Sequence, residues 1–294
     1  MTTTTSQSSD PTREVPTRRI SFAEALRDLP KHFAEGGDIV SSHLVASLSS
    51  VFPDGEDYFV RSVRHFRDQI ADPELKRQVR GFIGQEATHG REHRDLNDRL
   101  AELGYPTKVI ERWTRRGLAM RERIAPPISN LAATAALEHL TATIAEIVLT
   151  DEQARRMIGH PEVTNLFLWH ALEESEHKAV AFDVYRAVGG TERMRVWTMR
   201  FTRWGFLVGI GLQTAVSVAL DPDARRDLPA VRRSWRRLRR SPYLSRQTWQ
   251  RLKEYERPGF HPDDRDTTEL VERWRQELFG EAGTLNDRLA GSAA

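Results

Sequence analysis

The stretch HALEESEH places three glutamates and two histidines in the middle of an otherwise apolar segment. An α-helix turns about 100° per residue, so Glu174 lies about 40° to one side of His170 and His177 about 20° to the other. Val163 and Ala181 fall on the same stripe, which is the face that such a helix buries. The HxxxExxH pattern is therefore predicted to point into the core. By the same calculation, Glu173 lies at the border of this stripe, and Ser175 and Glu176 lie on the surface.

Three further segments carry acidic residues on predicted core faces. In GFIGQEATHGREH, Glu86 and His89 are three residues apart and share a stripe with His93. ALEHLTA places Glu138 among small side chains, and FPDGEDYF places Glu56 near the predicted start of its helix. The small residues leave room for a bound molecule, and we expect the following to line a cavity: Gly90, Thr134, Ala135, Thr141 and Ala142.

Helical start and stop signals divide the chain, whereas strand signals are scarce. We expect helices near residues 22–35, 54–70, 73–103, 107–124, 127–151, 161–188, 191–220 and 267–279. This order predicts an all-α, ferritin-like four-helix bundle with extra helices at both ends and in the crossover. The expected division is a disordered tail at 1–18, the helical domain at 19–220, and a basic, partly helical extension at 221–294 that packs on the bundle.

The four core glutamates are predicted to lie at one level of this bundle. If residues 54–70 and 73–103 form a hairpin, Glu56 and Glu86 each lie about 20 Å from its turn, at 1.5 Å per residue. Glu138 and Glu174 are level in the second hairpin by the same count. Burying four unpaired carboxylates together is strongly unfavourable, and two divalent cations would balance their charge.

A glutamate from each of two helices and Glu-x-x-His from each of two others is the di-iron or di-manganese carboxylate pattern. The chain has no cysteine, so any metal must have oxygen and nitrogen ligands. We therefore expect two iron ions as cofactors, with manganese or zinc as alternatives. Each histidine alone would more often be a hydrogen-bonded core residue. His93, Glu173 and Arg67 are candidates for residues that hydrogen-bond to the metal ligands and orient them.

The motifs FPDGEDYF, GFIGQEATHGREH, ALEHLTA and WHALEESEHKAVAFDVY, with RPGFHP near the C-terminus, resemble a bacterial family catalogued as predicted metal-dependent hydrolases. The order Glu, ExxH, Glu, HxxxExxH is also similar to the ligand set of di-iron arylamine N-oxygenases. That resemblance implies that Glu86 and Glu174 bridge two metals. It further implies two terminal ligand groups, one of Glu56 and His89 and the other of Glu138, His170 and His177.

Three functions remain open from these residues. The first is a di-iron oxygenase or oxidase that activates O₂ to oxidise an unidentified small or lipid-like molecule, with electrons from a donor. The second is a dinuclear metal-dependent hydrolase. The third is a non-catalytic, ferritin-like protein that handles iron.

Two other segments concern partners and location. Residues 224–240 hold eight arginines against one aspartate, which is typical of a solvated helix or of a surface for an anionic membrane. No nucleic-acid motif accompanies them, so we expect no nucleic-acid partner. Residues 204–220 are uncharged and predict a buried helix, a homodimer interface or membrane contact. We expect a cytoplasmic protein, either free or peripheral at the inner face of the membrane.

Overall fold

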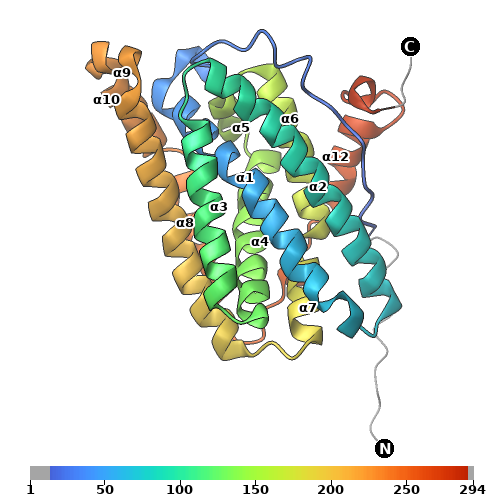
Figure 1. Ribbon diagram of the computed structural model, residues 1–294. Helices are drawn as coiled ribbons and strands as arrows, with labels where there is room; N and C mark the ends of the chain where they lie inside the picture. The colour runs from blue at the N-terminus through green and yellow to red at the C-terminus, as the bar shows by residue number, and fades with distance from the viewer. Residues whose placement is uncertain (1–13, 291–294) are drawn as a thin grey trace, which may run out of the picture.

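The structure is a computed structural model that describes residues 14–290 of the 294-residue chain (Figure 1). It is an all-α fold, as predicted, and the described residues contain no strand beyond one isolated bridge between Ile20 and Leu289. The helices are α1 Ile39–Phe66, α2 Pro73–Glu102, α3 Thr107–Ile124, α4 Pro127–Thr150, α5 Glu152–Ile158, α6 Pro161–His177, α7 Val180–Ala187, α8 Glu192–Leu220, α9 Pro222–Arg226, α10 Leu228–Leu238, α11 Arg246–Glu254 and α12 Thr268–Phe279.

Two helical hairpins form the bundle. Helix α1 packs along α2, and α4 packs along α6 and α7, while α3 makes the connection between the hairpins (Figure 1). Helix α8 lies on the outside against α1 and α4, and α10, α11 and α12 contact α1, α4 and α6 respectively. The predicted four-helix bundle with a helical crossover is confirmed.

Local capping explains why several boundaries could be predicted. Asp72 accepts a hydrogen bond from the backbone N–H of Glu74 at 3.0 Å, and Pro73 opens α2. Proline also opens α4 and α6, at positions 127 and 161. These signals lie within a few residues of the helix ends, so tertiary contacts are not needed to find them.

Helix α1 begins fifteen residues earlier than the predicted start at 54, because it continues through Pro53. Proline lacks the N–H that would bond the carbonyl four residues earlier, which belongs to Ser49. Asn97 of α2 donates its side-chain amide to that carbonyl at 3.1 Å. The interruption is thus compensated from another helix, and Glu56 lies in the middle of α1 rather than near its start.

Two other predictions about the backbone were wrong. Residues 22–35 form turns and the start of a short 3₁₀ helix at 35–37 instead of a helix, and the predicted helix 161–188 is broken between α6 and α7. Residues 1–13 of the expected tail lie outside the described residues. The rest of it has a defined place: Val15 and Thr17 lie so close to Gly81 and Gly84 that a Cβ on either glycine would collide.

Candidate metal centre

All seven predicted ligands meet inside the bundle. They come from four helices: Glu56 from α1, Glu86 and His89 from α2, Glu138 from α4, and His170, Glu174 and His177 from α6. None of the seven residues is more than 4% exposed. The helix faces that the sequence predicts to be buried are therefore the buried faces in the structure.

One half of the cluster surrounds His177. Its Nε2 lies 3.1 Å from Glu86 Oε1, 3.3 Å from Glu138 Oε2 and 3.6 Å from Glu174 Oε1. Ligands that bind one ion at about 2.0–2.2 Å lie at such separations from one another. These atoms could hold one metal ion with modest rearrangement.

The other half contains Glu56, His89 and His170. His170 Nε2 lies 3.0 Å from Glu174 Oε1 and 4.0 Å from Glu56 Oε1. His89 Nδ1 lies 3.8 Å from oxygens of both Glu86 and Glu174. Glu86 and Glu174 are thus close to both halves, as bridging ligands would be.

The position of His170 differs from the one that the N-oxygenase resemblance implies. It lies with Glu56 and His89 rather than with Glu138 and His177, and its ring stacks on that of His89 with centroids 4.1 Å apart. The helix gives the reason: residues 170 and 177 are separated by about 10 Å along the axis of α6, on opposite sides of Glu174.

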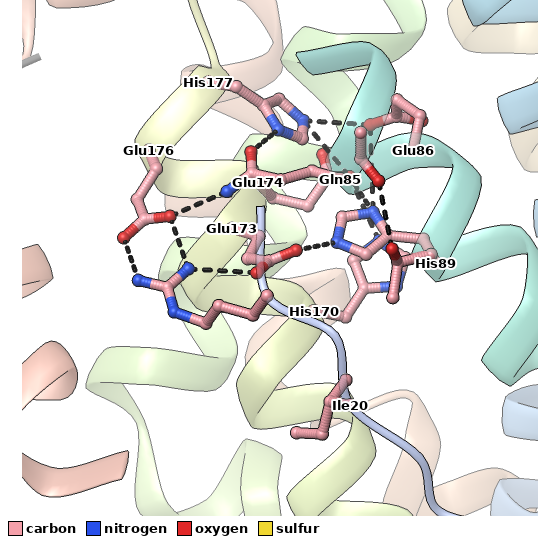
Figure 2. Close-up of polar contacts among 12 residues, drawn as sticks. Ile20, Gln85, Glu86, His89, His170, Glu173, Glu174, Glu176 and His177 are labelled. Carbon is pink, nitrogen blue, oxygen red and sulfur yellow. Dashed lines mark hydrogen bonds and ion pairs between the residues drawn. The ribbon is translucent and has the colours of Figure 1, made fainter. Parts of the chain in front are cut away.

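A buried carboxylate orients His89 (Figure 2). His89 Nε2 donates to Glu173 Oε2 at 2.9 Å, and Arg18 donates to the other oxygen of Glu173 at 2.9 Å. This leaves Nδ1 as the nitrogen that faces the metal position. A metal-binding histidine whose second nitrogen donates to a carboxylate is a recurrent arrangement. Glu173 thus contacts His89, a candidate ligand, on the side away from the cluster.

Gln85 orients His177, a role that the sequence did not reveal. Its Oε1 accepts a hydrogen bond from His177 Nδ1 at 2.7 Å, and its amide donates to Glu176 at 2.8 Å (Figure 2). Glu176 is itself bound by Arg18 and Arg275. Glu176 was expected on the surface, but this network buries its side chain completely. Residues from four separate segments form the network, so helix periodicity gives no signal for it.

A chain of hydrogen bonds fixes the tautomer of His170. Ser49 Oγ donates to Asn97 Oδ1 at 2.7 Å, so it must accept from His93 Nδ1 at 2.9 Å. Nε2 of the neutral His93 then accepts from His170 Nδ1 at 2.7 Å. The lone pair of His170 Nε2 therefore points at the carboxylates, and His93 contacts this candidate ligand from the other side of its ring.

Two other predictions about the surroundings of the site do not hold. Arg67 is exposed at the end of α1 and pairs with Asp68, so it does not support a ligand. Ser175 is buried rather than exposed, and its hydroxyl bonds the backbone of Ala171. Helix projection misplaced Ser175 because the chain segments around α6 cover more than one of its faces.

Charge in the cluster is unbalanced without metal. Burial, followed by the charge of a neighbouring glutamate, raises the pKa of Glu56 and Glu86 well above the usual value and that of Glu138 to about 7. Burial also opposes the charge of Glu174, but the neighbouring imidazoles of His170 and His177 outweigh it and hold the pKa well below normal. The cluster must either bind protons or bind cations.

Unpaired buried atoms of the candidate ligands indicate that the cluster could hold metal ions. Within the described part of the chain, these buried atoms have no hydrogen-bond partner: both carboxylate oxygens of Glu56, Glu86 and Glu138, Oε2 of Glu174, Nδ1 of His89 and Nε2 of His177. An unpaired buried polar atom costs about 1–3 kcal/mol, and more when it is charged. Coordination to two divalent ions would satisfy these atoms together.

A narrow apolar cavity of about 20 Å³ reaches the cluster at Glu174 and His170. The remaining lining residues come from α1, α4 and α6: Leu48, Phe52, Thr141, Ile144, Ala145, Val148, Phe167 and Ala171. Thr141 was expected there. The other expected lining residues are not among the described lining: Gly90 faces Glu56, Thr134 bonds Ser62, Ala135 packs in the core, and Ala142 is half-buried.

The fold and the site together define a helical bundle with buried glutamate and histidine clusters that could bind metals. The profile of the family described as predicted metal-dependent hydrolase matches residues 16–266, and the chain belongs to this family. No curated protein and no solved structure matches the chain significantly.

Proposed function

We propose that the protein is a di-iron oxidoreductase that activates O₂ and oxidises a small apolar organic substrate. Two bound iron ions would supply electrons to O₂, and an external donor would restore them. Four carboxylates suit this chemistry, because they can change between terminal and bridging binding as the charge of the metal changes. The neutral histidines add nitrogen donors that keep the total charge low.

The apolar cavity is the observation that carries this proposal. Leu48, Phe52 and Ile144 line it, and its polar groups are Thr141 and the site residues His170 and Glu174. A cavity of this size accommodates a molecule as small as O₂, and its apolar lining disfavours water and charged phosphoesters because polar molecules lose hydration on entering it. It also protects a reactive site from solvent.

A single-turnover experiment tests the proposal. The protein is loaded with iron, reduced without oxygen and mixed rapidly with O₂ while visible absorption and O₂ consumption are followed. We expect a transient absorption and consumption of O₂ in proportion to the iron bound. Protein that retains zinc and does not respond to O₂ in the iron form would contradict the proposal.

The family description favours a second candidate, a dinuclear metal-dependent hydrolase. In that case the metals would activate water, and esters or phosphoesters would be cleaved without oxygen. Anaerobic hydrolysis with zinc or manganese, lost in Glu174→Ala, would support this candidate over the oxidoreductase. The same anaerobic hydrolysis assay, applied to the iron form, distinguishes the hydrolase from the oxidoreductase within one preparation.

A further inference from the structure

Helices α3 and α8 expose apolar side chains along their outer faces. On α8, six large side chains between 50% and 73% exposed form a stripe: Trp197, Phe201, Trp204, Val208, Leu212 and Leu220. On α3, four side chains between 46% and 76% exposed form another: Val109, Trp113, Met120 and Ile124. Exposed apolar patches of this extent mark interaction surfaces.

The two stripes belong to one face. Helices α3 and α8 lie side by side and antiparallel (Figure 1), and a groove of about 500 Å³ joins them where α3 ends and α8 begins. Arg121 of α3 and Arg193, Trp197 and Phe201 of α8 line this groove. Aromatic rings beside guanidinium groups are typical of the boundary between lipid headgroups and acyl chains.

Hydropathy distinguishes α8 from the core. Within the described residues, α4 and α8 are the helices long and apolar enough to cross a membrane, but 72% of the apolar window of α4 is buried in the bundle against 28% of that of α8. The inner face of α8 carries the buried Arg195 and Arg203, which bond the segment after α11 and residues of α11. Helix α8 is therefore fixed to the protein on one side and open on the other.

Arginines accompany the apolar face. On α3, Arg112, Arg116 and Arg123 are exposed, and by helical angle they border the stripe of Trp113 and Met120. Exposed arginines also lie on α10, which follows α8 and the short α9, and directly after it: Arg232, Arg233, Arg236, Arg239 and Arg240. None of these eight has an acidic partner among residues 14–290. Their charge is available to an anionic partner.

We propose that the α3–α8 face binds an anionic lipid surface, with α8 lying in the plane of the membrane. The apolar stripes would enter the boundary of the acyl chains, and the arginines of α3 and α10 would contact the headgroups. A second copy of the chain fits this face less well as a partner, because its arginines would be brought close to the arginines of the first copy. The helix lies on the membrane rather than spanning it, since its other face packs on α1 and α4.

Vesicle flotation of the full-length, metal-loaded protein tests this inference. We expect binding to vesicles that contain phosphatidylglycerol and at least tenfold weaker binding to pure phosphatidylcholine. Val208→Glu with Leu212→Glu should abolish binding, because two charges would enter the apolar stripe. The matched control, Gln69→Glu with Ala71→Glu, adds the same charge at exposed positions beyond α1 and should bind normally.

A second pair of variants separates charge from apolar contact. Arg232→Ser with Arg236→Ser should weaken binding to phosphatidylglycerol several-fold and reduce its dependence on salt, whereas Arg64→Ser with Arg80→Ser should not. Melting temperatures confirm that each variant is folded. Failure of the wild-type protein to float with anionic vesicles overturns the inference. The inference is also overturned if sedimentation shows that the wild-type protein is a dimer, that Val208→Glu with Leu212→Glu dissociates this dimer, and that the protein does not bind vesicles.

Discussion

Asn97 and Ser49 form a two-point hydrogen-bonded pair that connects the interruption of α1 to the candidate metal site. The amide of Asn97 donates to the Ser49 carbonyl, which Pro53 leaves without its usual partner. The hydroxyl of Ser49 donates back to Asn97, and this direction makes His93 the donor to Ser49. One pair thus preserves the helix that carries Glu56 and sets the tautomer of His170.

Ser49→Ala should weaken metal binding on the His170 side. His93 would lose its hydrogen-bond acceptor and could adopt the other tautomer, which no longer accepts from His170. We expect a loss of about 10–100-fold in affinity for one ion, measured by competition with a chelator. Ser50→Ala is the matched control, since Ser50 is equally buried but bonds the backbone of Ala46. Equal affinities in the two variants would refute this role.

Glu173→Gln should lower metal affinity through His89. The amide can still accept from His89 Nε2 but carries no charge, so the imidazole becomes a weaker donor to the metal. We expect a smaller loss than for Glu173→Ala, within the same range of about 10–100-fold. The exposed Glu272→Gln on α12 serves as the control. Affinity that is unchanged in both Glu173 variants would show that the contact is structural only.

Removing single histidines should deplete different metal positions. His170→Ala should reduce occupancy beside Glu56 and His89, and His177→Ala should reduce occupancy beside Glu86 and Glu138, because the donors are grouped in this way. Metal analysis gives the total, and Mössbauer spectra of the iron form resolve the two positions. Loss of the same spectral component in both variants would contradict the grouping.

Metal affinity should rise with pH through the neutral range. Without metal, burial and neighbouring charge raise the pKa of Glu138 to about 7 and that of Glu86 well above the usual value, so protons occupy the site. Metal must displace these protons, and binding therefore weakens as the pH falls. Calorimetry in buffers of different ionisation enthalpy measures the protons released. The range from pH 6 to 8 covers about one unit on either side of the pKa of Glu138. A metal affinity that stays constant across this range would be inconsistent with this account.

Filling the apolar cavity should slow the reaction with O₂ without removing metal. Ala145→Leu places a larger side chain in the cavity lining, next to Ile144 and Val148. Ala136→Leu is the control, because Ala136 is equally buried in α4 but outside the lining residues described. Both variants should lose about 1–3 kcal/mol of stability from overpacking, but only Ala145→Leu should slow O₂ consumption. Equal rates would mean that O₂ enters elsewhere.

Helical periodicity made much of the site predictable. The stripe shared by His170, Glu174 and His177 follows from a fixed angle per residue, and the level of Glu86 follows from a fixed rise. Start signals such as Asp72 and Pro73 act within one turn, so α2 could be placed almost to the residue. These features depend on neighbours in the sequence, which is why the sequence reveals them.

Contacts between distant segments account for the errors. A proline such as Pro53 is expected to end a helix when only local hydrogen bonds are considered. Here the side-chain amide of Asn97 in α2 bonds the carbonyl that Pro53 leaves free, and α1 continues. Gln85 and Glu176 looked ordinary because their partners, including Arg18 and Arg275, come from both ends of the chain. His170 was grouped incorrectly because a pattern along one helix does not say which neighbouring carboxylate lies nearest.

The sequence alone determined the helical class, the buried faces and the oxygen and nitrogen donors that those faces bring together, because a helix repeats by a constant angle and rise. The tertiary structure decided how those donors divide into two groups, which nitrogen of His89, His170 and His177 faces the metal position, and which apolar residues lead to it. It also showed that the apolar stripe of α8 is exposed. These properties depend on the packing of separate helices and on directional hydrogen bonds between them, which no local pattern contains.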